Sequence, residues 1–165
     1  MAKKRGSTGK TPATEKAVAL LFDSFGELYA LDDIARNLGE SPLTVLTNIE
    51  ITKALCAPLV VRMNECEKLL GIGHRAANET ETASQTLAAL VQFVDALYDG
   101  GNGYLLPPHS AGVAMRAFVI QTGRAIERAE IALDANGGSA GYLSDAFYDT
   151  EPTTASKQSR EACHG

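Results

Sequence analysis

The sequence predicts an all-α protein, and the prediction depends on periodicity and composition. Apolar residues between the terminal segments recur at steps of three and four, the period of a helix with one buried face. No segment alternates apolar and polar residues as a half-buried strand does. The chain of 165 residues is 45% apolar and 21% charged, which suits a single core. We therefore expect a five- to six-helix bundle over residues 12–137, with a basic arm over 1–11 and a flexible tail over 138–165.

Two helices are predicted before residue 40. Thr11 and Pro12 are typical of a helix start, because Pro is tolerated at the first helical position. An apolar face then continues at helical spacing as far as Tyr29. A second, short helix is predicted over residues 31–38, and Gly39 ends it at a turn that needs a left-handed residue.

The remaining helices are predicted from the same signals. A third helix begins at Pro42 after Ser41, and it ends at one of the two glycines that follow Leu70. Pro58 lies inside it and has no N–H to donate, so we expect a kink or a restart there. Two more helices are predicted over residues 81–98 and 111–135.

The charge of the chain is unevenly distributed. The formal net charge is −5, yet the first 16 residues balance at +4 and the other 149 at −9. The cations of the predicted arm are Lys3, Lys4, Arg5 and Lys10. A basic arm on an acidic body is typical of a segment that contacts a polyanion, and a merely solubilising terminus is the alternative.

Several function classes lack support in the sequence. The three cysteines are widely spaced, and no Cys-x-x-Cys or His-x-x-x-His pair indicates a metal site. No nucleophile and base occur in a recognisable arrangement, so we expect no catalytic residue and no cofactor. The apolar runs are shorter than a membrane span, and the N-terminus has no secretory apolar region. The sequence therefore predicts a non-enzymatic protein without a membrane partner, located in the cytoplasm or within a virion or ribonucleoprotein particle.

Residues 31–49 carry a local motif. Ala35 is followed by Gly39 four residues later and by Val45 six residues after that, with Ile34 and Leu38 supplying further apolar contacts. This spacing resembles the helix-turn-helix family. The resemblance implies that Ala35 lies where two helices cross and that the second helix is presented to the DNA major groove.

The same resemblance names the residues that would face DNA. Thr44, Thr47 and Asn48 occupy early exposed positions of the second helix, and the nearest cations are Arg36 and Lys53. Threonine and asparagine side chains form hydrogen bonds with bases or phosphates. A two-helix corner with a purely structural role is the alternative.

A second basic feature lies on the last predicted helix. Arg116, Arg124 and Arg128 fall on one stripe at helical spacing. Such a stripe is able to follow a phosphate backbone or to meet acidic patches of another subunit. The alternative is pairing within the helix, with Glu127, Glu130 and Asp134 as the available acids.

Together these features favour a nucleic-acid-binding protein, with DNA preferred over RNA, that self-assembles or joins other protein subunits. The layout of arm, corner motif, long helices and tail is similar to that of phage terminase small subunits, which implies recognition of viral DNA by a ring. The alternative is an all-helical small subunit of a ribonucleoprotein, similar to the small subunits of CRISPR effector complexes, or a helical virion protein. In that class the arginine stripe and the arm hold a backbone without reading sequence.

Overall fold

A computed structural model describes residues 9–38, 42–97 and 105–134, and every regular element in those ranges is a helix. The predicted all-helical class is confirmed. The helices are α1 (Pro12–Phe22), α2 (Phe25–Arg36), α3 (Pro42–Leu70), α4 (Arg75–Ala96) and α5 (Pro108–Ala132). The first eight residues of the predicted arm, Gly39 and the predicted tail lie outside the described residues.

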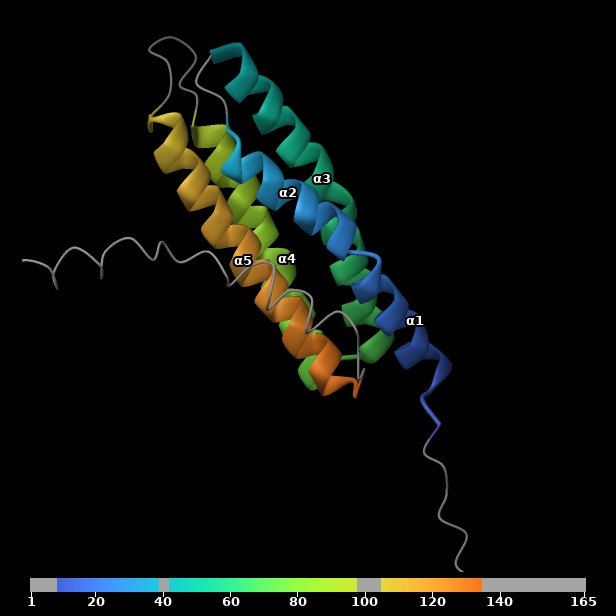
Figure 1. Ribbon diagram of the computed structural model, residues 1–165. Helices are drawn as coiled ribbons and strands as arrows, with labels where there is room; N and C mark the ends of the chain where they lie inside the picture. Colours follow the sequence, from blue (N-terminus) through green and yellow to red (C-terminus); the bar gives the residue numbers. More distant parts are fainter. Residues whose placement is uncertain (1–8, 39–41, 98–104, 135–165) are drawn as a thin grey trace, which may run out of the picture.

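The helices are arranged in four antiparallel columns, of which α1 and α2 together form one (Figure 1). The helix α3 runs back beside α1 and α2, α4 packs against α3, α5 packs against α4, and α2 closes the ring against α5. Short connections favour this up-and-down order, because consecutive helices then pack as antiparallel neighbours.

The first column breaks at Asp23 and Ser24. The prediction of one apolar face continuing to Tyr29 and a separate helix over 31–38 is wrong, since α2 begins at Phe25 and runs unbroken to Arg36. The buried hydroxyl of Ser24 donates to the carbonyl of Leu20 at 2.8 Å, a local bond that competes with the helix ladder and bends helices. The spacing of apolar residues alone does not predict such a bond.

Arg62 of α3 spans this break. Its Nη1 donates to the Asp23 carbonyl at 3.2 Å, and its Nη2 lies 2.7 Å from Oε1 of Glu27 in the first turn of α2. The hydrogen bond from Arg62 lowers the pKa of Glu27 below its ordinary value. One side chain of α3 thus contacts the end of α1 and the start of α2.

The helix α3 continues through Pro58 for 29 residues, so the predicted restart does not occur. Pro58 removes one N–H, the donor for the carbonyl of Ala54, and the rest of the ladder is kept. Ala54 is exposed, so this carbonyl does not face an apolar interior. The helix ends where predicted, and Gly71 and Gly73 adopt positive φ angles of 83° and 88°.

Two helix starts lie earlier than predicted. The helix α4 begins at Arg75 rather than near residue 81, because Nδ1 of His74 accepts from the Ala76 N–H at 3.1 Å and caps the end. Histidine is outside the usual set of capping residues, so the sequence did not predict this start of α4. The helix α5 begins at Pro108 rather than 111 and ends at Ala132 rather than 135.

The core runs along the axis of the bundle. Its largest fully buried side chains come from all five helices and include Leu21, Leu28, Leu31, Leu59, Met63, Leu87, Leu90, Met115 and Ile126. Cys56 and Cys66 are also buried as free thiols, as predicted for small core residues. Burial raises the pKa of the Cys56 thiol to about 11 and that of the Cys66 thiol to about 12.

Candidate nucleic-acid interface

The predicted arm is described only at its end. Lys10 is exposed, and Lys3, Lys4 and Arg5 lie outside the described residues. The helix α1 begins directly after Lys10, with Thr11 as its cap accepting from the Thr14 N–H at 3.2 Å. Lys10 therefore lies two residues before the first residue of α1.

The predicted DNA-reading residues lie at the start of α3. Thr44 and Thr47 are exposed and Asn48 is half-buried. The hydroxyl of Thr47 donates to the Leu43 carbonyl at 2.9 Å. A phosphate oxygen needs a donor, and this hydroxyl has already given its single proton to the helix. In this rotamer Thr47 presents only an acceptor to a ligand.

Lys53 faces two carboxylates. Its Nζ lies 2.8 Å from Oδ1 of Asp95 on α4 and 3.4 Å from Oε1 of Glu50. The hydrogen bond that Lys53 donates to Asp95, followed by the one it donates to Glu50, raises the pKa of Lys53 above its ordinary value. The positive charge predicted to support the corner is thus matched by acids of the same molecule.

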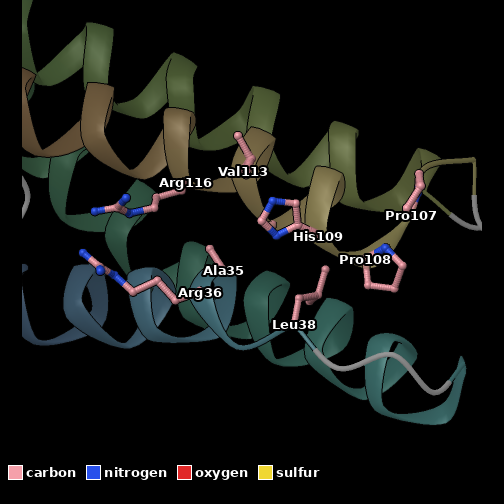
Figure 2. Close-up of a pocket in the computed structure, with 9 residues that line it drawn as sticks. Ala35, Arg36, Leu38, Pro107, Pro108, His109, Val113 and Arg116 are labelled. Carbon is pink, nitrogen blue, oxygen red and sulfur yellow. The ribbon is translucent and has the colours of Figure 1, made fainter. Parts of the chain in front are cut away.

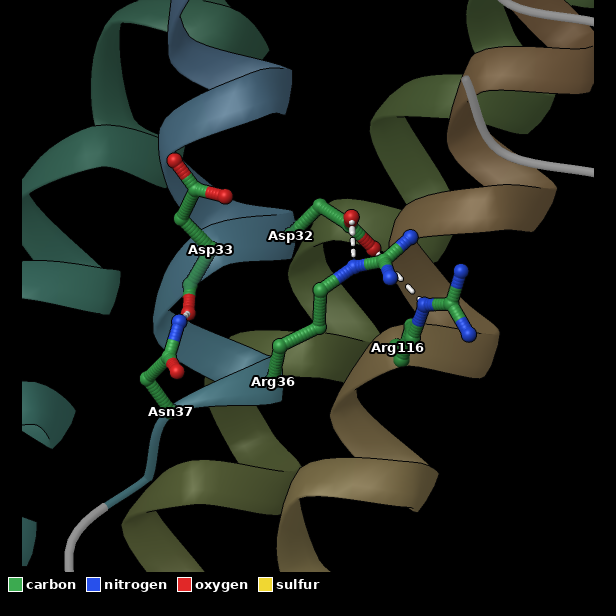
Figure 3. Close-up of polar contacts among 5 residues, drawn as sticks. All are labelled: Asp32, Asp33, Arg36, Asn37 and Arg116. Carbon is green, nitrogen blue, oxygen red and sulfur yellow. Dashed lines mark hydrogen bonds and ion pairs between the residues drawn. The ribbon is translucent and has the colours of Figure 1, made fainter. Parts of the chain in front are cut away.

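Arg36 and Arg116 share one buried carboxylate (Figure 3). Nε of Arg36 donates to Oδ2 of Asp32 at 2.5 Å, and Nε of Arg116 donates to Oδ1 of the same residue at 2.9 Å. The side chain of Asp32 is only 8% exposed. Arg116 has no acid nearby in sequence, and its partner lies 84 residues away on α2. The sequence alone did not connect Asp32 with α5.

The other arginines of the predicted stripe differ in their surroundings. Nε of Arg128 donates to Oε2 of Glu79 on α4 at 2.8 Å, so its acid comes from a neighbouring helix and not from Glu127, Glu130 or Asp134. Arg124 is exposed. Two of the three guanidiniums of the stripe therefore join helices of the bundle.

Ala35 of the predicted corner lies beside α5. Ala35 is buried, as the motif requires, but its backbone meets Gly112 of α5: a Cβ built on Gly112 would lie 2.3 Å from the Ala35 carbonyl oxygen. Val45 and Leu38 are buried as well. The absence of a side chain at Gly112 thus permits a close approach of α2 to α5.

One surface was not singled out by sequence reasoning. Nine exposed positions of α3 fall at helical spacing on one side, and we call them the α3 outer face: Leu43, Thr47, Glu50, Ile51, Ala54, Ala57, Val61, Asn64 and Lys68. The exposed fraction is 76% for Leu43 and 64% for Val61. The signal lay in the sequence, since apolar residues recur at helical spacing among polar ones on the side opposite the core positions of α3.

The helix α3 is also long and apolar enough to cross a membrane by length and composition, over Leu43–Leu70. Core helices of soluble proteins pass the same test when they are mostly buried, but only 28% of its most apolar stretch is buried here. The antiparallel packing of α3 with α1, α2 and α4 is compatible with a soluble protein.

The comparisons with known proteins returned no relatives: no family model, no curated protein and no solved structure matches the chain. Within residues 9–38, 42–97 and 105–134, no group of three or more His, Cys, Asp or Glu side chains is placed to hold a metal ion. The interpretation of the surface therefore depends on its own chemistry.

Proposed function

We propose that the protein is a non-enzymatic assembly subunit that pairs with a second copy through the α3 outer face and contacts nucleic acid through its basic arm. The observation that carries this proposal is the exposure of Leu43, Ile51 and Val61 on one side of a single helix. Contiguous exposed apolar side chains are typical of a protein interface. The face extends over about 38 Å, at 1.5 Å per residue from Leu43 to Lys68.

A second copy fits this face better than an unrelated partner, because the face is complementary to itself. In an antiparallel pair about a two-fold axis, placing Ala57 opposite Val61 of the other copy places a small residue against a large one. The same register places Glu50 opposite Lys68. The two-fold axis then gives each dimer two Glu50–Lys68 pairs, and both charged residues of the face lie opposite a residue of the other charge.

The register also provides for the carbonyl that Pro58 leaves without its helical donor. It places Asn64 of one copy opposite Ala54 of the other. Oδ1 of Asn64 accepts from the Ser84 hydroxyl at 3.0 Å. The amide nitrogen of Asn64 is then the donor available to the Ala54 carbonyl across the interface.

The nucleic-acid part of the proposal is supported by the charges of the body. Arg36, Lys53, Arg116 and Arg128 all have acids of the same chain within ion-pair distance. The arm carries four cations and no acid over residues 1–11. These charges favour an arm that binds the nucleic-acid backbone and is carried by an assembled acidic body. They agree less well with reading of bases by the start of α3, because Glu50 there repels phosphates.

The assembly is tested by light scattering after size-exclusion chromatography across a range of protein concentrations. We expect a dimer for the wild type and a monomer for Val61→Lys, because this change places an unpaired cation opposite Ala57 of the other copy in the apolar face. Ile131→Lys is the matched control, since Ile131 is 60% exposed on α5, away from this face. The control is expected to remain dimeric.

The register is tested by exchanging charges. Glu50→Lys or Lys68→Glu alone is expected to weaken the dimer, and the double substitution is expected to restore it. A wild type that is monomeric at every concentration would overturn the proposal. Flotation of the wild type with lipid vesicles, lost in Ile51→Lys, would instead assign the face to a membrane.

A further inference from the structure

Val18 and Phe22 form an apolar strip on α1, which we call the α1 strip. Phe22 is 63% exposed, and Val18, one turn before it, is half-buried. Lys16 faces α3, because its Nζ contacts Glu65 there. Val18 lies two residues after Lys16 and therefore on nearly the opposite side of α1. The α1 strip thus lies on the side of α1 that α3 does not cover.

The α1 strip is level with the last turns of α5. The bond between Asp32 and Arg116 fixes where the first column and α5 meet, and the two run in opposite directions (Figure 1). Phe22 precedes Asp32 by ten residues, or about 15 Å of helix, and the same length of α5 after Arg116 leads to Ile126. The helix α5 ends six residues later, at Ala132. The chain therefore leaves α5 close to the α1 strip.

The chain also turns where α5 ends. Asp134 has a positive φ of 49°, the left-handed conformation that ends many helices. Residues 136–138 are Asn-Gly-Gly, residue types that favour turns. Tyr142 follows Asp134 by eight residues, which span up to about 26 Å when extended. The level of Phe22 is about 12 Å back along α5 and about 10 Å across to the neighbouring helix axis, so this length of chain is sufficient to reach it.

We propose that residues 142–148 pack against the α1 strip of the same chain. Four of these seven residues are large apolar or aromatic ones: Tyr142, Leu143, Phe147 and Tyr148. Leu143 and Phe147 are four residues apart, a spacing that places both on one face of a helix. An aromatic side chain packed against Phe22 removes a large apolar area from water. Because the segment belongs to the same chain, its effective concentration at the strip is on the order of millimolar, which favours it over a separate partner.

A single tryptophan tests the contact, because the chain has none of its own. Phe147→Trp places the probe within the segment of the full chain, and Ala155→Trp places a matched probe further along the sequence. Quenching by acrylamide is expected to be at least about twofold weaker in Phe147→Trp, with emission at a shorter wavelength, because a side chain removed from water is less accessible to the quencher. Equal quenching of the two variants would overturn the proposal.

The place of the contact is tested by adding Phe22→Asp to Phe147→Trp. Phe22 is 63% exposed, so folding is little affected, and quenching is expected to rise to the level of Ala155→Trp. The matched control is Val113→Asp, at a position that is 60% exposed and lines a groove between the end of α2 and the start of α5 (Figure 2). This groove lies about 20 Å along α5 from the level of Phe22, so the control is expected to leave quenching unchanged. Quenching that ignores the charge at position 22, or that responds to the charge at position 113 instead, would overturn the proposal.

Dilution separates this contact from contacts between copies. Protection of the tryptophan in Phe147→Trp is expected to be the same at every protein concentration and after addition of Val61→Lys, which disrupts pairing through α3. Protection that is lost on dilution or with Val61→Lys would overturn the proposal, because the segment would then lie on a second copy. A chain that does not pair through α3 would still show the protection, so this proposal and the proposed assembly fail separately.

Discussion

Asp32 is a buried carboxylate that bonds arginines of two different helices. It satisfies Arg36 on its own helix and Arg116 on α5 from a side chain that is 8% exposed. The two guanidiniums remain 32% and 21% exposed, so water reaches them when the carboxylate is removed. The cost of removing Asp32 is therefore smaller than for a fully buried ion pair.

We expect Asp32→Asn to destabilise the protein by about 2–3 kcal/mol, below the roughly 3–5 kcal/mol measured for broken buried pairs. Urea unfolding followed by circular dichroism measures the difference. The neighbouring substitution Asp33→Asn is the control, since Asp33 is exposed and only its backbone carbonyl is bonded, to Asn37 at 2.9 Å. That control is expected to change stability by less than about 0.5 kcal/mol. Equal effects of the two substitutions would contradict the role of Asp32.

The buried thiols give a second prediction at the scale of single residues. Burial raises the pKa of Cys56 from 9.0 to about 11 and that of Cys66 from 9.0 to about 12. At pH 8 the native protein is therefore expected to leave both cysteines unmodified by iodoacetamide, because the thiolate is the reactive form. Mass spectrometry of the peptides measures each cysteine separately, and modification of both after unfolding in urea is the positive control.

The same pKa values set a direction for stability. As the pH rises above 9, the thiols of the unfolded chain lose protons before those of the folded chain, so stability is expected to fall between pH 9 and about 11 to 12. A Cys66→Ala variant should lose part of this decline. An identical slope in the variant and the wild type would show that other groups cause it.

At the scale of the helices, Gly112 sets the distance between α2 and α5. A Cβ at this position would lie 2.3 Å from the Ala35 carbonyl oxygen, which is backbone and has no rotamer to change. We expect Gly112→Ala to cost about 1–3 kcal/mol of stability through overpacking. This cost exceeds the gain of up to about 1 kcal/mol that alanine brings inside a helix.

Gly26 provides the control for this prediction. It lies in the first turn of α2, and a Cβ there would meet nothing within 4 Å. Gly26→Ala is expected to stabilise the protein by up to about 1 kcal/mol, because only the helix propensity changes. Thermal melts of the two variants should shift in opposite directions. A stabilised Gly112→Ala would mean that α2 and α5 are not in close contact.

The helices differ in how far the sequence predicts them. The period of apolar residues predicted the helical class, and Gly71 ended α3 where expected, because both signals are local. The break after Phe22 depends on the bond of Ser24 to the backbone, and the start of α4 depends on a histidine cap. Both features depend on hydrogen bonds between a side chain and the backbone, and the spacing of apolar residues does not reveal such bonds.

The candidate site was less predictable for a related reason. The arginine residues were found from spacing, but their partners Asp32 and Glu79 come from other helices, 84 and 49 residues away. Whether a cation is available to a phosphate depends on such pairs. A single sequence identifies which face of a helix carries charge and does not identify which helix faces it.

At the scale of the whole molecule, pairing through α3 would place two basic arms on one particle. Nζ of Lys16 in α1 lies 2.6 Å from Oε1 of Glu65 near the end of α3, so each arm starts at that end of the helix. An antiparallel pair puts these ends on opposite sides of the two-fold axis. One nucleic acid is then able to contact both arms, and the second contact is strengthened by the first.

Deletion of residues 1–10 is expected to remove most of the affinity for nucleic acid and most of its salt dependence. Four cations leave with this segment, and at about 0.9 per phosphate contact the slope of log K against log salt should become shallower by up to about 3.6. Fluorescence anisotropy with random-sequence duplex DNA and single-stranded RNA measures both slopes. Arg128→Gln is the control, because Arg128 already pairs with Glu79, and its slope should change by less than about 1. A deletion variant that binds like the wild type, beside a weakened Arg128→Gln, would move the nucleic-acid contact from the arm to α5.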